Sequence, residues 1–226
     1  MTPSILRTQD AKYLQPPKTR VDDVKELIQG VEIADPYRWL EDQQSSETRA
    51  WIDAQDKYSR ALLDSWPAWA ALKRRLTGLM KVETINVPME RNGKYFFKRR
   101  SADQDQGVLC MRVGADGKDE VLVDPNPLSP DKNISVDLED ASQDGTLVAY
   151  SLRQGGADET TVHLLDVSTR SELQDQLPKR VYFTFSIKPD KSGLYYSWAE
   201  AGGPRVSYHA MGSNPTQDVE VFGKGY

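Results

Sequence analysis

A block of this sequence repeats at an interval of 46 residues, and that repeat constrains the fold more than any other feature. The matched pairs keep one register, without a gap, from an aspartate turn through two strand-like segments. They are Asp144 and Asp190, Tyr150 and Tyr196, Ser151 and Ser197, Gly156 and Gly202, and His163 and His209. A looser copy lies upstream, where Phe97 precedes Tyr150 by 53 residues. A period of about 40–50 residues with several strands per copy is typical of the blades of a β-propeller.

From about residue 82 onward, short runs of β-branched and aromatic residues alternate with turn-forming dipeptides such as Asn92-Gly93 and Asp144-Gly145. The runs predicted as strands are 95–97, 108–113, 120–123, 147–151, 161–167, 181–187, 194–198, 205–210 and 219–222. No long helical pattern interrupts them, which excludes a helical solenoid. Other antiparallel sandwiches remain possible, because they also space their strands regularly.

The number of copies is as informative as their period. Residues 81–226 hold about three blade-sized units, whereas propellers close with roughly 4–8 blades. We therefore expect a partial β-propeller, an open arc of about three blades. The end blades of such an arc would expose apolar faces and strand edges that need neighbours.

Residues 1–80 follow a helical pattern instead. Ser46 is a candidate N-cap for a helix with Glu47 in its first turn. The spacing of its apolar residues by three and four puts on one face Trp51, Ala54, Tyr58, Ala61 and Leu62. A second helix is expected to begin at Pro67 and to end near Gly78. Four of the five tryptophans lie in residues 39–69, and we expect these rings to dock the helices on another surface.

Composition limits the compartment and the partners. The net charge of −5 is spread along the chain, which argues against nucleic acid or an anionic membrane as the main partner. No run of about 18 apolar residues encodes a membrane helix, and residues 1–10 lack the apolar core of a signal peptide. The single cysteine, Cys110, cannot form an internal disulfide and is expected to be a small buried hydrophobe. Together these features predict a cytoplasmic protein.

No catalytic, cofactor-binding or metal-binding residue is predicted. The chain contains no Gly-x-Ser-x-Gly pattern for a nucleophilic serine. Its only histidines, His163 and His209, occupy equivalent repeat positions, which favours a shared packing or surface role over catalysis. The paired carboxylates Asp22-Asp23 and Glu41-Asp42 are expected to be solvated or to cap helices. One cysteine and two distant histidines give no zinc spacing, so no cofactor is expected.

The segment Ala34-Asp-Pro-Tyr-Arg-Trp-Leu-Glu-Asp42 resembles the N-terminal hallmark of the prolyl oligopeptidase family. The surrounding order is also similar, and the resemblance extends from about residue 16 to the end of the chain. Further similar segments are Thr19-Arg-Val-Asp-Asp23, Gly93-Lys-Tyr-Phe-Phe97, Val121-Leu-Val-Asp-Pro-Asn126 and Gly203-Pro-Arg-Val-Ser-Tyr-His209.

This resemblance implies a fold and a function. Members of the family are serine peptidases that cut short peptides after proline, with a seven-bladed propeller covering the active site of an α/β-hydrolase domain. It implies that residues 1–80 pack on the hydrolase domain and that residues 81–226 are the first blades of a propeller truncated from seven. The family's catalytic residues have no matching positions here, so the chain alone is expected to be inactive.

Three hypotheses follow. The chain is the N-terminal fragment of a prolyl oligopeptidase-like serine endopeptidase, whose hydrolase domain is supplied in cis and whose substrates are short proline-containing peptides. Alternatively, it is a non-catalytic propeller module that binds a partner, or one half of a split peptidase whose hydrolase domain docks in trans. No nucleic acid or membrane partner is expected in any of these.

Overall fold

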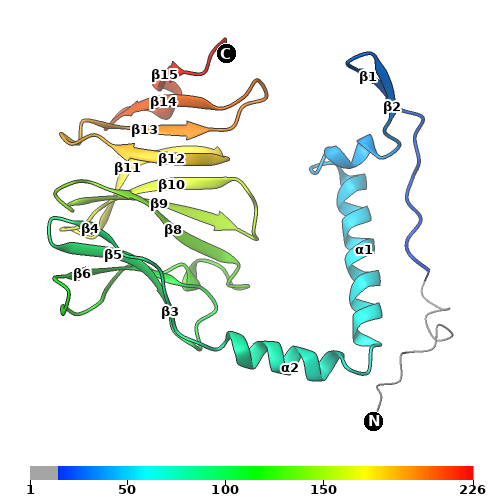
Figure 1. The fold of residues 1–226 in the computed structure, drawn as a ribbon, viewed down its shortest axis with the longest axis horizontal. Helices are drawn as coiled ribbons and strands as arrows, with labels where there is room; N and C mark the ends of the chain where they lie inside the picture. The colour runs from blue at the N-terminus through cyan, green and yellow to red at the C-terminus, as the bar shows by residue number, and fades with distance from the viewer. Residues whose placement is uncertain (1–14, 226) are drawn as a thin grey trace. The chain divides into compact units, whose positions relative to one another are not determined.

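A computed structural model describes residues 15–225 of the chain. The first ten residues, considered above for a signal peptide, lie outside this range. The chain divides into two compact units, with the boundary between Leu79 and Met80. The first unit is mainly helical and the second is built from β-strands (Figure 1).

The first unit begins with an extended segment and a hairpin of β1 (Lys25–Ile28) and β2 (Val31–Ala34). A short 3-10 helix, η2 (Arg38–Glu41), leads into helices α1 (Ser46–Asp64) and α2 (Trp69–Met80). No side chain in residues 15–79 is buried except that of Thr48. This unit therefore has no apolar core of its own within the described residues.

The ends of both helices differ from the prediction. Ser45, not Ser46, is the N-cap of α1, because its backbone is extended and its hydroxyl oxygen accepts a hydrogen bond from the Thr48 N–H at 3.1 Å. Helix α2 begins at Trp69 rather than at Pro67, and it continues through Gly78 to Met80. Glycine lowers helix stability by about 1 kcal/mol without stopping it, and Gly78 keeps a helical backbone here.

The second unit contains three antiparallel sheets. The first comprises β3 (Thr84–Ile85), β4 (Met89–Arg91), β5 (Lys94–Arg100), β6 (Val108–Val113) and β7 (Glu120–Val123). After the 3-10 helix η3 (Asn126–Leu128), the second follows with β8 (Ile134–Ala141), β9 (Leu147–Gln154), β10 (Thr160–Asp166) and β11 (Ser171–Arg180). The third consists of β12 (Tyr182–Ile187), β13 (Gly193–Trp198), β14 (Arg205–Ala210) and β15 (Val219–Phe222), with η4 (Pro215–Gln217) before its last strand.

The second and third sheets have the same topology, since each is a meander of four strands in chain order. All nine predicted strands are present, four of them with the predicted bounds: β6, β7, β14 and β15. The prediction missed the short strands β3 and β4 of the first sheet. It also missed β8 and β11, which form the two edges of the second sheet and carry many polar residues. Pro178 fits in β11 because an edge strand has one side without a hydrogen-bonding neighbour.

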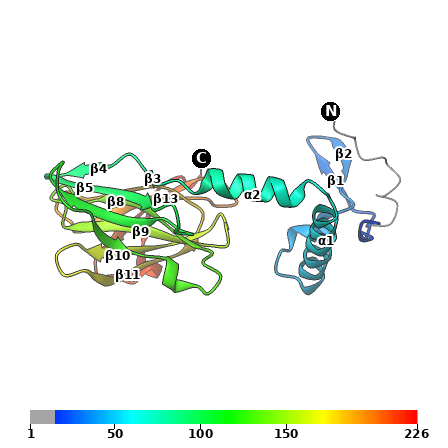
Figure 2. The same ribbon diagram turned by 90° about the horizontal axis from the view of Figure 1, so that it is seen from below.

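Two apolar clusters hold the three sheets face to face. One joins the first and second sheets and includes Phe96, Leu109 and Tyr150. The other joins the second and third sheets and includes Leu164, Leu177 and Leu194. Strand β8, the first strand of the second sheet, contacts β5 of the first sheet and β12 of the third; Figure 2 shows β5 beside β8.

The chain is thus mainly β with an N-terminal helical segment, and its sheets form an open partial propeller. None of the helices in residues 15–225 has the length and apolar character needed to cross a membrane.

Candidate functional site

The residues that the sequence singles out for possible chemistry make structural contacts. Cys110 is buried in β6, and burial raises the pKa of its thiol. Asp22 forms an ion pair with Arg20 at 3.0 Å, and Asp42 accepts hydrogen bonds from the backbone ahead of α1. Cys110 therefore packs in the interior, and the two aspartates hold an arginine and a turn.

The hallmark segment organises the first unit. Trp39 donates from its indole nitrogen to the Arg20 carbonyl oxygen at 3.1 Å, and its own carbonyl oxygen accepts from the Thr48 hydroxyl at 3.1 Å. The guanidinium of Arg20 stacks over the Trp39 ring, 4.7 Å from its centroid, and pairs with Glu47 at 2.6 Å. Trp51 packs edge-on against Trp39. Trp39 therefore ties the extended segment to the start of α1.

Arg38 in the same segment ties η2 to the hairpin. Its guanidinium lies 2.5 Å from Asp35 and 2.5 Å from Glu26 of β1. Hydrogen bonds to these two carboxylates raise the pKa of Arg38 above its ordinary value. The hallmark thus consists of anchoring contacts, and its charged groups already pair with one another.

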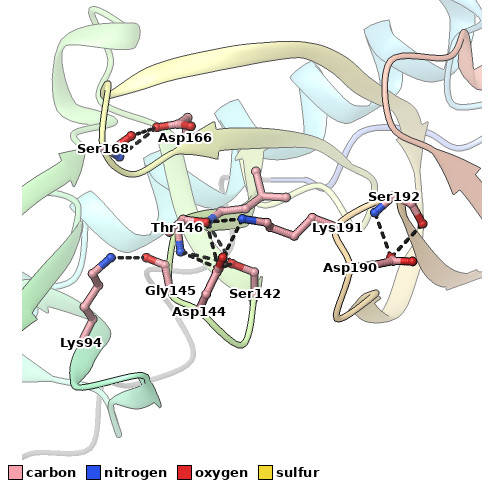
Figure 3. Close-up of polar contacts among 11 residues, drawn as sticks. Lys94, Ser142, Asp144, Gly145, Thr146, Asp166, Ser168, Asp190, Lys191 and Ser192 are labelled. Carbon is pink, nitrogen blue, oxygen red and sulfur yellow. Dashed lines mark hydrogen bonds and ion pairs between the residues drawn. The ribbon is translucent and has the colours of Figure 1, made fainter.

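A polar rim of turns links the three sheets in the second unit (Figure 3). Lys191, in the turn before β13, donates to Asp144 Oδ2 at 2.6 Å and to Thr146 Oγ1 at 2.8 Å. Lys94 of the first sheet donates to the Gly145 carbonyl oxygen at 2.8 Å. One aspartate turn of the second sheet therefore contacts both neighbouring sheets.

The rim aspartates are held ionised. The pKa of Asp144 lies well below its usual range because Lys191 and the Ser142 hydroxyl donate to its carboxylate. In Asp190 the backbone and hydroxyl of Ser192 lower the pKa to about 2, and Asp166 reaches a similar value through Ser168 and Thr169. These carboxylates act as acceptors that fix turns, a role unsuited to proton transfer near neutral pH.

A cavity of about 530 Å³ lies between the three sheets, lined by residues of β4, β8 and β12 and of the turns that follow β4 and β8. Asp140 lines this cavity. Its carboxylate accepts a hydrogen bond from the Ile187 N–H at 2.8 Å and lies 3.4 Å from the Arg91 guanidinium. Arg91 also donates to the Ala141 carbonyl oxygen at 2.9 Å. The other lining groups include Asn92, Gln143, Phe185 and Ser186. The cavity is therefore lined by charged as well as polar groups, including the carboxylates of Glu90 and Asp140 and the guanidinium of Arg91.

The two histidines lie at equivalent places in the third strands of their sheets, β10 and β14, as the repeat predicts. Each also has a carboxylate partner that the sequence analysis missed, Glu172 for His163 and Asp218 for His209. The signal was present, because these two carboxylates are also 46 residues apart. In residues 15–225, no group of three His, Cys, Asp or Glu side chains could hold a metal ion.

Comparison with known proteins agrees with this architecture. The family model of the prolyl oligopeptidase N-terminal β-propeller domain matches residues 16–225. The prolyl endopeptidase of Elizabethkingia meningoseptica is 30% identical over 226 residues, covering 95% of this chain and 32% of the relative. That of Dictyostelium discoideum is 26% identical over 182 residues, covering 72% of this chain and 24% of the relative.

Solved structures give the same result. One from a structural and mechanistic analysis of two prolyl endopeptidases superimposes with a TM-score of 0.77 at 33% identity, covering 91% of this chain and 32% of the other. Prolyl oligopeptidase B from Galerina marginata, bound to a 35mer substrate, shares the fold with a TM-score of 0.69 at 24% identity, covering 92% of this chain and 33% of the other.

The fold and its contacts define a class of domain in which an open arc of propeller blades follows a helical segment. The chain belongs to the prolyl oligopeptidase family and corresponds to its N-terminal propeller domain. It spans about a third of the length of the curated relatives it matches, and the catalytic domain of those peptidases is absent from it.

Proposed function

We propose that this chain supplies the N-terminal segment and the first propeller blades of a prolyl oligopeptidase-type serine endopeptidase, which cleaves short peptides after proline. The observation that carries the proposal is the match over residues 16–225 to the prolyl oligopeptidase N-terminal β-propeller domain, in relatives of which this chain covers about a third. In this proposal the catalytic serine, aspartate and histidine belong to that domain, provided in cis or in trans.

The surface of the first unit supports a docking role. Its helices α1 and α2 and the turn between them carry large apolar side chains that are 39–53% exposed: Leu62, Leu63, Trp66, Leu72, Leu76 and Leu79. At about 25 cal/mol per Å² of apolar surface removed from water, covering this set would give several kcal/mol. In the proposal the hydrolase domain packs on this apolar helical face, as the family resemblance implies for residues 1–80.

Exposed side chains of the first and third sheets support the second part of the proposal, in which further blades complete the propeller. Val121 of the first sheet is 55% exposed, and Phe183 and Val221 of the third are 55% and 50% exposed. Apolar side chains in this position are suited to packing against further blades. In the proposal, a completed ring then restricts access of large substrates to the active site.

The direct test is reconstitution of activity. The chain alone, incubated with a chromogenic proline-containing peptide, is expected to give no hydrolysis. The remaining part of the Elizabethkingia meningoseptica relative, produced as a separate polypeptide, is then added, and hydrolysis above that of either part is expected. The variant Leu76→Gln should weaken this gain by removing an apolar docking contact, whereas Thr77→Gln on the same helix should not.

Two results would contradict the proposal. Hydrolysis by the purified chain alone would show that it carries catalytic groups of its own. Failure of reconstitution together with an immunoblot band at 25.5 kDa, the mass of this chain, would favour a stand-alone binding module. The immunoblot uses source cells and an antibody against residues 34–55. A band of far higher mass would place the hydrolase domain in cis.

A further inference from the structure

A three-residue motif of tyrosine, histidine and carboxylate occurs once in each of the second and third sheets. The spacing is the same in both: 13 residues from tyrosine to histidine, and 9 from histidine to carboxylate. The members are Tyr150, His163 and Glu172 in one sheet, and Tyr196, His209 and Asp218 in the other. In each copy the tyrosine hydroxyl donates to the carboxylate, which also faces the histidine.

The second copy has an additional partner from the neighbouring sheet. The His209 ring is fully buried, with Nδ1 2.7 Å from Asp218 Oδ1 and Nε2 3.0 Å from Asp175 Oδ1. Asp175 belongs to β11, so this contact crosses from the third sheet to the second. Both carboxylates are also nearly buried, with side chains 8% and 6% exposed.

The hydrogen bonds around His209 require one proton more than a neutral imidazole ring carries. A neutral imidazole donates from one nitrogen only, whereas both nitrogens of His209 face carboxylate oxygens. Asp218 already accepts from the Tyr196 hydroxyl at 2.7 Å, and Asp175 from the Gly212 N–H. With a neutral ring, one carboxylate would lie buried against a nitrogen lone pair, which is costly.

We propose that His209 is held as an imidazolium that clamps the second sheet to the third through Asp175 and Asp218. A doubly protonated ring donates to both carboxylates, and such charge-assisted hydrogen bonds are the stronger kind. The clamp is therefore a proton-dependent joint between two blades. Loss of that proton would leave the two carboxylates with one ring N–H between them across the joint between the two sheets.

The surroundings of the ring agree with this assignment. Strand β13 contributes Tyr196 and strand β12 contributes Tyr182; burial, more than any other cause, raises the pKa of both phenols, so both remain neutral donors. Arg180 at the end of β11 adds a positive charge near Tyr196, and its guanidinium stacks over Trp198 at 3.8 Å. Leu194 pairs with His209 across β13 and β14, and it belongs with Leu177 to the apolar cluster between the two sheets.

His163 is the matched internal control. Its Nδ1 lies 3.5 Å from Glu172, but its Nε2 faces the neutral amide of Gln176 at 3.5 Å. One N–H therefore suffices for this ring, and the motif in the second sheet contains no second carboxylate. We expect His163 to be neutral under conditions in which His209 carries both protons.

The test is direct observation of the ring nitrogens. In ¹⁵N-labelled full-length chain at pH 7, NMR is expected to show protons on both Nδ1 and Nε2 of His209, and on one nitrogen only of His163. The His163→Gln and His209→Gln variants assign the signals. A His209 ring with one unprotonated nitrogen would overturn the proposal, since the proton would then lie on a carboxyl group or be absent.

A second measurement tests the clamp itself. Asp175→Asn should return His209 to a singly protonated ring and raise amide hydrogen exchange in strands β12 to β15 at least tenfold. Glu172→Gln changes the equivalent carboxylate of the motif that lies wholly within the second sheet, and it should leave exchange in the third sheet unchanged. Unchanged exchange in Asp175→Asn, or an equal rise in both variants, would contradict a joint between the sheets.

Discussion

A single turn position in two successive sheets allows backbone strain and side-chain contact to be measured separately. Lys191 has φ of 56° and Gly145, its equivalent 46 residues earlier, has φ of 64°. A non-glycine residue in this left-handed region costs about 1 kcal/mol. Lys191 tolerates it while its side chain bonds Asp144 and Thr146.

Two substitutions at Lys191 should therefore differ in a defined way. Lys191→Ala keeps the strained backbone and loses a half-exposed ion pair worth about 0.5 kcal/mol, plus a hydrogen bond worth about 0.5 kcal/mol. We expect it to lower the free energy of unfolding by about 1 kcal/mol. Lys191→Gly loses the same contacts but relieves about 1 kcal/mol of strain, so its stability should stay close to that of the unmodified chain.

Gly145→Ala is the reference at the equivalent position. A Cβ there would lie 2.8 Å from the Arg91 carbonyl oxygen and 3.1 Å from Lys94 Cδ, in addition to the left-handed strain. The expected loss is roughly 2–3 kcal/mol, the sum of strain and overpacking. Urea unfolding followed by far-UV circular dichroism measures all three variants. Equal stabilities of Lys191→Ala and Lys191→Gly would refute the strain argument.

Three further predictions concern individual side chains. The lowered pKa of Asp144 stabilises the fold at pH values above the ordinary aspartate pKa, and this stabilisation is lost progressively as pH falls toward the lowered pKa; in thermal unfolding the disadvantage of Asp144→Asn should therefore begin to shrink below about pH 4. Burial raises the pKa of Glu139, so its ionisation weakens the fold as pH rises; Glu139→Gln should melt higher than the unmodified chain at pH 7, with the difference vanishing toward acid pH. An equal or lower melting temperature of Glu139→Gln at pH 7 would contradict this prediction, because favourable contacts of the carboxylate would then offset the cost of burying it. Leu194→Ala, at a fully buried site between two sheets, should cost about 2–5 kcal/mol in urea unfolding, whereas exposed Leu128→Ala should stay within about 0.5 kcal/mol.

The strands could be predicted wherever apolar residues dominate and a turn dipeptide marks the end. Strand β6 (Val108–Val113) and strand β14 (Arg205–Ala210) have the expected bounds for this reason. Strands β8 and β11 lie at the edges of their sheet, where one side has no neighbouring strand. Their many polar residues interrupt the alternation of apolar and polar positions by which a strand is predicted. At the start of α1, two adjacent serines are equivalent in sequence, and only the extended backbone at Ser45 selects the cap.

The polar contacts between sheets were less accessible from the sequence. The repeat identified His163 and His209 as equivalent, and the same interval relates Glu172 to Asp218. The link from His209 to Asp175 follows from no interval, because it depends on how β11 packs against the third sheet. Lys191 likewise gives no sequence signal that its ammonium group reaches the preceding sheet.

The junction between the second and third sheets shows why such polar links matter in a propeller. Apolar packing between sheets is non-directional and permits one sheet to slide or rotate over another. Three aspartates of the second sheet oppose this at separate places: Asp140 in its first strand holds the Ile187 N–H, Asp144 at the rim holds Lys191, and Asp175 in its last strand holds His209. Three separated attachment points between two layers fix both their offset and their angle. Because the curvature of a propeller is the sum of the angles between its blades, these aspartates help to determine whether an arc of this kind can continue into a ring.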